Sequence, residues 1–476
     1  MDATQPDQYP SSDVHPAIRI WNTGVLAVNP RTQVMNACQI DPSSINIAGH
    51  EFSREQIKRV IVVGGGKATA AMTQGFVDAV QGQIPTCGWV NVPQDKPERS
   101  IGKTDSAEYL SGIRVFPARP MGLNEPTAAA VQGTLEIIRL TQQADASDLC
   151  VALISGGGSA LLTLPADGIT LQDKLQVIRR LSESGADIVQ LNTVRKHLSE
   201  VKGGGLLAAC NGPLVTLVLS DVLGDPLDLI ASGPTVPDTS LPSDAMNILQ
   251  HFDPQRSLPA NVYRVLERAV ASTNDETQNR LQDFTPPVVI GNNETAVNAS
   301  AELARELMFE TESKSAQTCE GCAETIGIQI AQWILTRLDQ SVATCLVWGG
   351  EPTVSLAPPD LRGLGGRNQQ LVLAAYQRLL QANLSDEEWS RISLVSGGTD
   401  GEDGPTDAAG AVLTGSVHQK AQQLDLDVES SLSRNDAYHF FQQCGGLLKS
   451  GPTGTNVCDV RVAIVTGRQH PAGNAP

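Results

Sequence analysis

The sequence predicts an α/β protein of two domains: an N-terminal Rossmann-like parallel sheet with helices on both faces, and a C-terminal α/β domain. Short apolar runs rich in β-branched residues, such as 58–63 and 214–219, are typical of buried strands, and each ends at glycines or at a Ser-Asp pair. Longer helical stretches, such as 127–142 and 171–185, alternate with these runs and indicate βαβ units. In such sheets, ligands bind in the loops at the carboxyl ends of the strands.

The chain has 476 residues, which is too long for one average domain. We expect a flexible polar leader over 1–17 and an N-terminal domain over 18–240. A segment rich in Pro, Asp and polar residues predicts a connector over 241–285, and a C-terminal domain over 286–476. A strand is predicted at 460–465, and the sequence leaves open which of the two sheets it joins.

The formal net charge is −18, which disfavours nucleic acid and anionic membranes as partners. No run reaches about 18 apolar residues, and the first residues lack the layout of a signal peptide, so we expect a cytoplasmic protein. The nine scattered cysteines predict free thiols. Cys319 and Cys322 are spaced like zinc ligands, but no second pair accompanies them. A monomer and a homodimer are equally compatible with the sequence.

Two glycine-rich turns follow predicted strands in the N-terminal half. Gly64-Gly65-Gly66 precedes Lys67, and Ser155-Gly156-Gly157-Gly158-Ser159 places three glycines between two hydroxyls. Glycines let backbone N–H groups approach an anion closely, and Lys67 adds a full charge. The first turn is not a Walker loop, because Ala68 stands where that loop requires Ser or Thr. A purely structural turn is the alternative for both.

Further candidate residues carry charge. Arg195 and Lys202 belong to the most basic stretch of an acidic chain and could hold a carboxylate or a phosphate. Asp221 and Asp225 follow a buried strand, which suits a general base or a magnesium ligand, although Asp also caps turns.

The C-terminal half offers a second group of polar loops. Glu351 and Arg367 lie in two glycine-rich loops; they suit phosphoryl transfer, or they form an ion pair that joins the loops. Asn368 follows Arg367, and Asn456 lies in a Gly/Thr loop that could donate to phosphate. Asp400 and Asp403 invite a metal interpretation, but their spacing is not that of an EF-hand.

Taken in order, these motifs resemble the glycerate 2-kinase family, whose C-terminal half is called the MOFRL domain. The resemblance covers roughly residues 18–466 and rests on these strings: GGGKATAAM, SGGGSALL, NTVRKHLSEVKGGGL, LSDVLGDPLDLIASGPTVPD, GGEPTVSL, GLGGRNQQ, SGGTDGEDGPTDAAGA and GPTGTNVCDV. One departure lies at 116–121, where relatives usually carry Gly-His-Pro and this chain has no His. The Cys319–Cys322 pair is also atypical.

The resemblance implies an active site in the cleft between the two domains, with ATP and Mg²⁺, and phosphorylation of the 2-hydroxyl of D-glycerate. It implies functional roles for Lys67 and Arg367. We expect Lys67, Arg195, Lys202 and the 155–159 turn to hold glycerate and the transferred phosphoryl group. Asp221 or Asp225 would orient the hydroxyl, with magnesium on some of Asp221, Asp225, Glu351, Asp400 and Asp403. The alternatives are an NAD(P)H-dependent hydroxypyruvate reductase and a non-catalytic sugar-acid-binding protein.

Overall fold

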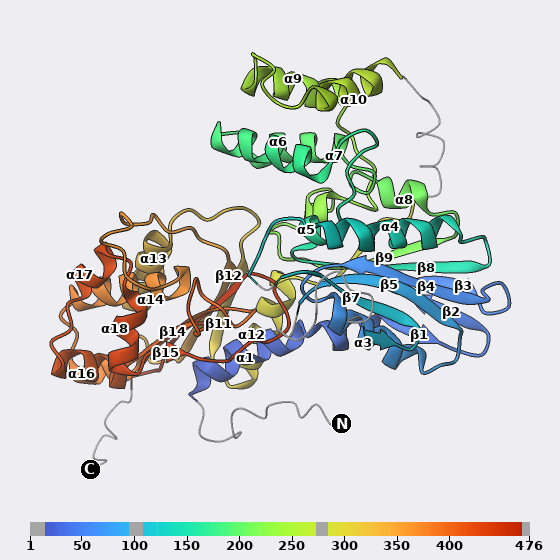
Figure 1. Ribbon diagram of the computed structural model, residues 1–476. Coiled ribbons are helices and arrows are strands. Elements are labelled where there is room, and N and C mark those ends of the chain that lie inside the picture. Colours follow the sequence, from blue (N-terminus) through green and yellow to red (C-terminus); the bar gives the residue numbers. More distant parts are fainter. Residues whose placement is uncertain (1–14, 95–107, 121, 273–283, 469–476) are drawn as a thin grey trace, which may run out of the picture. The chain divides into compact units, whose positions relative to one another are not determined.

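The computed structural model describes residues 15–94, 108–120, 122–272 and 284–468. The chain forms two compact units (Figure 1). Unit 1 combines Met1–Asn29 with Gly291–Pro476, and unit 2 is Pro30–Ile290. Most of the predicted leader lies outside the described residues. No helix within the described ranges has the length and apolar composition needed to cross a membrane.

Unit 2 is built on a seven-stranded sheet of order β10-β9-β8-β4-β5-β7-β6. Strands β9, β8, β4, β5 and β7 are parallel, and β6 is antiparallel to β7. All eight residues of β8 are buried, as expected for a central strand covered on both faces. The bounds are β4 (Arg59–Gly65), β5 (Thr86–Pro93), β6 (Glu108–Leu110), β7 (Ile113–Arg119), β8 (Asp148–Ser155), β9 (Leu214–Leu219) and β10 (Val288–Gly291).

Helices cover both faces of this sheet, as the sequence predicts. Figure 1 shows α3 (Thr69–Val80) on one face, and α4 (Ala128–Gln142), α5 (Gly158–Leu161) and α8 (Gly205–Ala209) on the other. A short 3₁₀ turn (Ile230–Ser232) contacts α5. The helix α2 (Pro30–Ala37) leads into a small antiparallel sheet of β1 (Cys38–Ile40), β2 (Ser44–Ile47) and β3 (His50–Ser53).

A further layer of four helices lies beyond α4 and α5 in Figure 1. These are α6 (Leu171–Glu183), α7 (Ile188–His197), α9 (Pro242–Phe252) and α10 (Ala260–Ala271). They share an apolar core that includes Val177, Val194, Leu249 and Leu266. The structure therefore differs from the predicted connector over 241–285, because α9 and α10 bury apolar faces inside unit 2. Residues 273–283 of that segment lie outside the described residues.

Unit 1 is built on a six-stranded sheet of order β11-β12-β16-β13-β14-β15. Only β11 and β12 are parallel; every other neighbouring pair is antiparallel. The last strand, β16, lies in the middle of this sheet between β12 and β13, which answers the question that the sequence left open. The bounds are β11 (Glu310–Ser315), β12 (Thr344–Gly350), β13 (Ile392–Gly398), β14 (Gly410–Thr414), β15 (Leu447–Leu448) and β16 (Asp459–Val465).

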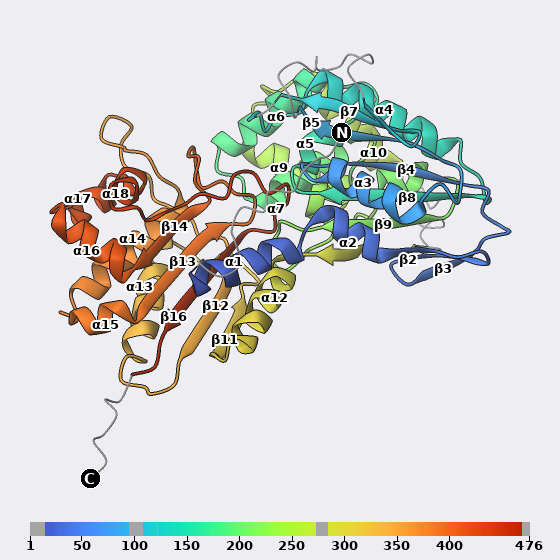
Figure 2. The same ribbon diagram turned by 90° about the horizontal axis from the view of Figure 1, so that it is seen from below.

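Helices α1 (Pro16–Ala27) and α12 (Asn293–Glu306) lie side by side on one face of this sheet (Figure 2). The helices that complete the unit are α13 (Ala323–Leu335), α14 (Arg367–Leu380), α15 (Asp386–Ser390), α16 (Gly415–Gln423), α17 (Val428–Ser433) and α18 (Ala437–Cys444). The sequence placed residues 18–29 in the N-terminal domain, but α1 buries Ile20 and Trp21 in unit 1. The indole of Trp21 donates to the carbonyl oxygen of Gly397 at 3.2 Å, 376 residues along the chain.

We predict that Gly24→Ala lowers the free energy of unfolding by about 1–3 kcal/mol, despite the better helix propensity of Ala. A Cβ at this position would lie 2.3 Å from Oγ of Ser300 and 2.8 Å from the carbonyl oxygen of Ala296. Ser300 donates to the carbonyl oxygen of Ile20 at 2.9 Å, so it cannot move away without losing that bond. Urea unfolding measures the change. Leu26→Ala, at an exposed position of the same helix, is the control, and an equal loss in both variants would contradict the prediction.

Candidate functional site

The predicted residues of unit 2 gather at one edge of its sheet. Strands β4, β8 and β9 are parallel neighbours, so their carboxyl ends meet at the same edge. Lys67 follows β4, the Ser155–Ser159 turn follows β8, and Asp221 follows β9.

The two glycine-rich turns are locked to each other. The backbone N–H of Lys67 donates to the carbonyl oxygen of Gly156 at 2.8 Å, and that of Ala68 donates to Oγ of Ser155 at 3.0 Å. A Cβ on Gly66 would lie 2.1 Å from the same Oγ. Close approach of the two turns therefore requires glycine at position 66. The alternative interpretation, a purely structural turn, is sufficient to explain this glycine.

The second turn packs closely against side chains from the two neighbouring loops. Gly157 has φ of 76°, a conformation that glycine adopts at no cost. A Cβ there would be 3.2 Å from Cγ of Lys67, and a Cβ on Gly156 would be 2.1 Å from Oδ2 of Asp221. The Lys67 stem and the Asp221 carboxylate therefore both lie against the Gly156-Gly157 backbone. Backbone N–H groups in such a turn favour anions.

Lys202 is buried at the far end of the same turn. Its ammonium donates to the carbonyl oxygens of Ser159 at 2.8 Å and Ala231 at 3.3 Å, and it makes no ion pair with a described residue. The hydroxyls of Ser159 and Ser232 are 3.1 Å apart. Burial lowers the pKa of Lys202 well below its ordinary value, and the positive charges of Lys174 and Arg195 lower it further.

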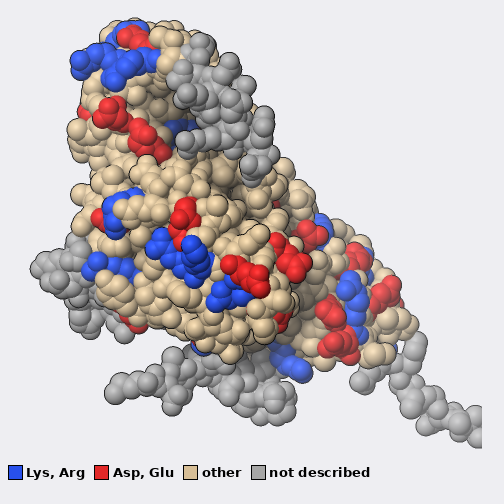
Figure 3. All heavy atoms as spheres, turned by 90° about the vertical axis from the view of Figure 1, so that its right-hand side faces the viewer, with Lys and Arg blue, Asp and Glu red and all other residues tan. Residues whose placement is uncertain are grey.

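Lys174 is a cation that the sequence analysis missed. Its side chain is buried, and its Nζ has no hydrogen-bond partner among the described residues. Burial lowers its pKa to about 7. Lys174 shares the buried face of α6 with Val177 and Leu181, so a lysine on an otherwise apolar helix face was the available signal. Together with the half-buried Arg195 and the buried Lys202 it forms a cationic cluster. By contrast, Figure 3 shows cations and anions interspersed on one face of the surface.

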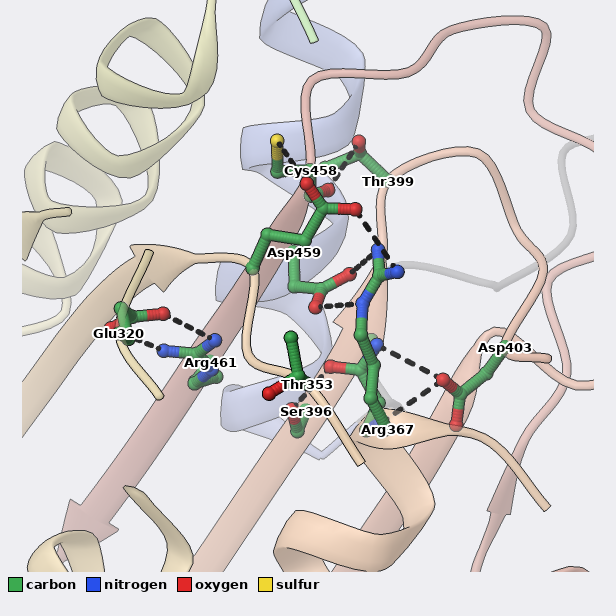
Figure 4. Close-up of polar contacts among 12 residues, drawn as sticks. Glu320, Thr353, Arg367, Ser396, Thr399, Asp403, Cys458, Asp459 and Arg461 are labelled. Carbon is green, nitrogen blue, oxygen red and sulfur yellow. Dashed lines mark hydrogen bonds and ion pairs between the residues drawn. The ribbon is translucent and has the colours of Figure 1, made fainter. Parts of the chain in front are cut away.

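Arg367 is a charged residue of unit 1 that two carboxylates hold in place. It is the first residue of α14, and its Nε and Nη2 bind the two carboxylate oxygens of Asp459 at 2.7 and 2.9 Å (Figure 4). Its Nη1 lies 3.1 Å from Oε1 of Glu351. Burial opposes the charge of Arg367, but the two carboxylates outweigh burial and raise the pKa of the guanidinium above its usual range. The sequence predicted the proximity of Glu351 and Arg367 and missed Asp459.

Asp403 caps the amino end of α14. Its carboxylate accepts the backbone N–H groups of Asn368 at 3.0 Å and Gln369 at 2.8 Å, and the Asn368 side chain in turn accepts from Ser396 at 2.6 Å. Burial is the largest influence on Asp403 and raises its pKa to about 7, despite these hydrogen bonds. Asp403 therefore stabilises the amino end of α14, and its predicted role as a metal ligand stays a prediction.

A second buried ion pair lies on β16. Arg461 is 1% exposed and donates to both carboxylate oxygens of Glu320, at 3.1 and 2.9 Å. Glu320 lies between Cys319 and Cys322, which are both free. The segment whose cysteines are spaced like zinc ligands therefore contributes the Glu320 carboxylate to this ion pair, and its thiols take no part in the pair.

The predicted metal ligands do not form a cluster. Among the described residues, no group of three or more His, Cys, Asp or Glu side chains is arranged to hold an ion. Glu351 faces Arg367, Asp400 accepts the backbone N–H of Glu402 at 3.1 Å, and Asn456 accepts that of Cys458 at 3.2 Å. Asp225 belongs to unit 2. The interdomain active site expected from the family stays a prediction.

Comparison with known proteins identifies both halves of the chain. A domain of unknown function, DUF4147, matches residues 17–267, and the MOFRL family matches 344–459. A glycerate 2-kinase of Pyrococcus horikoshii is 34% identical, covering 95% of this chain and 97% of its own length. A glycerate kinase of Danio rerio is 36% identical over 94% and 96%. The crystal structure of a glycerate kinase from Thermotoga maritima has a TM-score of 0.78 and 30% identity, covering 95% of this chain and 99% of that one.

We predict that Glu320→Gln lowers the free energy of unfolding by about 3–5 kcal/mol, because it leaves the buried Arg461 charge without a counter-ion. Chemical denaturation measures the loss. Glu310→Gln, at an exposed position of β11 in the same sheet, is the control and should change stability by less than about 0.5 kcal/mol. Similar values for the two variants would show that the pair is not a buried one.

We also predict a pH-dependent contribution from Asp403. Its native pKa of about 7 exceeds the ordinary carboxyl value of roughly 4, so the unfolded chain releases the proton first as pH rises. Its contribution is complete below about pH 4 and is lost as pH rises through about 7. The unfolding free energy of the wild type minus that of Asp403→Asn should therefore fall between pH 5 and pH 8. Asp425→Asn, at an exposed turn, should give a constant difference.

Proposed function

This chain belongs to the glycerate 2-kinase family, and from that premise we propose that it transfers the γ-phosphate of ATP to the 2-hydroxyl of D-glycerate, giving 2-phosphoglycerate and ADP. The observation that supports this most is the anion site of unit 2, where Lys67 and Asp221 lie against the Gly156-Gly157 backbone. A kinase must hold two anionic reactants; this edge of the sheet supplies a glycine turn and Lys67, and unit 2 also carries the buried Lys174 and Lys202 with the half-buried Arg195.

Asp221 has the role of base in this proposal. Its carboxylate lies against Gly156, at the turn that binds the anion, so a hydroxyl of a substrate bound there is within its reach. Phosphoryl transfer depends chiefly on positioning and on neutralising charge, so Asp221 acts mainly by orienting the 2-hydroxyl. As the hydroxyl oxygen forms its bond to phosphorus, its proton passes to the Asp221 carboxylate.

Arg367 has the role of stabilising the charge that spreads over the transferred phosphoryl oxygens. The fork of its guanidinium is held by Asp459, which is fully buried, and Glu351 binds the remaining nitrogen. About a third of the Arg367 side chain remains exposed, so the group is accessible to a ligand without rearrangement. A pre-positioned guanidinium avoids the cost of reorganisation during the reaction.

Magnesium fits this chain as a companion of the nucleotide rather than as a resident ion. Mg²⁺ in phosphoryl-transfer sites is held by phosphate oxygens and one or two carboxylates, and it neutralises charge between the phosphates. The carboxylates that would contact it are Asp225 in unit 2, or Glu351, Asp400 or Asp403 in unit 1.

The decisive experiment is incubation of the purified chain with D-glycerate, ATP and Mg²⁺, with ADP release followed by a coupled assay and the product identified by ³¹P and ¹H NMR. We expect 2-phosphoglycerate. Formation of 3-phosphoglycerate would overturn the assignment of the hydroxyl, and ADP release without a phosphorylated acid would overturn the kinase proposal itself.

We predict that Lys67→Ala lowers kcat by about 10²–10³-fold with an unchanged Tm, because an exposed side chain is removed at the anion site. Lys58→Ala, an exposed lysine just before β4, should leave both kcat and Tm unchanged.

Arg367→Lys should lower kcat comparably, since Lys keeps a charge but cannot bind Asp459 through two nitrogens. Arg367→Ala would leave the buried Asp459 unpaired, so Arg367→Lys is the more informative substitution. Full activity in Lys67→Ala and in Arg367→Lys would exclude both residues from the site.

A further inference from the structure

Arg119 is the last residue of β7, at the same edge of the sheet as the anion site. The strand order places β7 next to β5, which in turn is next to β4, and all three run in parallel. Its side chain is therefore carried to the edge where Lys67 and the Gly156–Gly158 turn lie. The sequence analysis noted the segment 116–121 as unusual but gave Arg119 no role.

The Arg119 guanidinium is buried without a counter-ion among the described residues. The residue is only 3% exposed, and its Nε has no hydrogen-bond partner there. Of the other buried arginines, Arg461 is held by Glu320, and Arg391 donates to the carbonyl oxygens of Thr466 and Gln340. A buried, unpaired cation is unfavourable unless an anion compensates it. The chain has 52 acidic residues against 34 basic ones, so the lack of a carboxylate here does not reflect a shortage of them.

The direction of the Arg119 side chain indicates which kind of group neutralises its charge. A Cβ placed on Gly157 would be 3.7 Å from Nη2 of Arg119 and 3.2 Å from Cγ of Lys67. Two cations, one just after β4 and one at the end of β7, therefore flank the same glycine, in the turn whose N–H groups favour anions. Because Gly157 has no side chain, its backbone can approach closely an anion that the two cations hold. Burial also lowers the pKa of Arg119, because burial disfavours the charged form and no described carboxylate offsets this cost.

We propose that Arg119 is a substrate-binding residue, which acts with Lys67 to hold an anionic oxygen group of a reactant over Gly157. This inference rests on the proposed kinase function and adds a residue to that site. A guanidinium can bind two oxygens of one planar or tetrahedral anion. The group held is either the carboxylate of the acceptor acid or a phosphoryl group of the nucleotide.

Steady-state kinetics of the full chain with Arg119→Gln tests the proposal and separates the two sources. If Arg119 holds the carboxylate, KM for D-glycerate rises at least about tenfold and KM for ATP stays within about twofold. If it holds a phosphoryl group, KM for ATP rises instead. Arg119→Lys should fall between the wild type and Arg119→Gln. Unchanged KM values for both substrates in Arg119→Gln would overturn the proposal.

Equilibrium binding distinguishes this proposal from the kinase function. Calorimetric titration with D-glycerate, and separately with inorganic phosphate, requires no turnover. We expect at least one of the two anions to bind Arg119→Gln about tenfold or more weakly than the wild type. If the wild type binds D-glycerate but does not phosphorylate it, the kinase proposal fails while this result still supports Arg119. Equal affinities of wild type and Arg119→Gln for both anions would overturn the role of Arg119 whatever the activity.

Arg114→Gln is the matched control. It lies on the same strand, but its guanidinium stacks over Trp89 at 4.9 Å and Tyr109 at 5.2 Å. We expect it to leave both KM values unchanged. Removing the unpaired charge of Arg119 should not lower Tm, since no ion pair among the described residues is lost. A lowered Tm with unchanged anion affinity would assign Arg119 a structural role and overturn the proposal.

Discussion

The placement of β16 in the middle of the unit 1 sheet is the constraint on which that unit depends. This strand carries Asp459 and Arg461 into positions with almost no exposure to water, where each charge needs a partner with good geometry. Asp459 is neutralised by Arg367 at the start of α14, and Arg461 by Glu320 before α13. Strand β16 therefore fixes the start of α14 and the segment before α13. The contact that neutralises the buried Asp459 carboxylate also orients Arg367.

Much of unit 2 could be predicted from the sequence, because its strands are continuous apolar runs that end at glycines and its chemistry follows them directly. The loops after β4, β8 and β9 meet because parallel strands end at one edge. Arg119 and Lys174 were missed for a physical reason: each is a charged residue inside a segment whose neighbours are buried. Patterns of hydrophobicity mark such positions as core and do not indicate which buried charge lacks a partner.

Unit 1 was harder to predict because its contacts join distant parts of the chain. The pairing of Arg367 with Asp459 spans 92 residues, and that of Glu320 with Arg461 spans 141. The sequence predicted an α/β domain here but not its strand directions, and β16 returns antiparallel to both neighbours. The sequence located Glu351, Arg367 and Asp403 in loops, but only the structure assigns Asp403 to the amino end of α14.

Unit 1 is assembled from both ends of the chain, and this has a consequence for biosynthesis. Helix α1 is synthesised before unit 2, yet the sheet that it covers is completed only by β16, more than 400 residues later. Unit 2 is a continuous insertion and can fold while synthesis continues. Throughout that time, Ile20 and Trp21 lack the surface that buries them in the native state. The nascent chain therefore exposes the apolar face of α1 until β16 has been made.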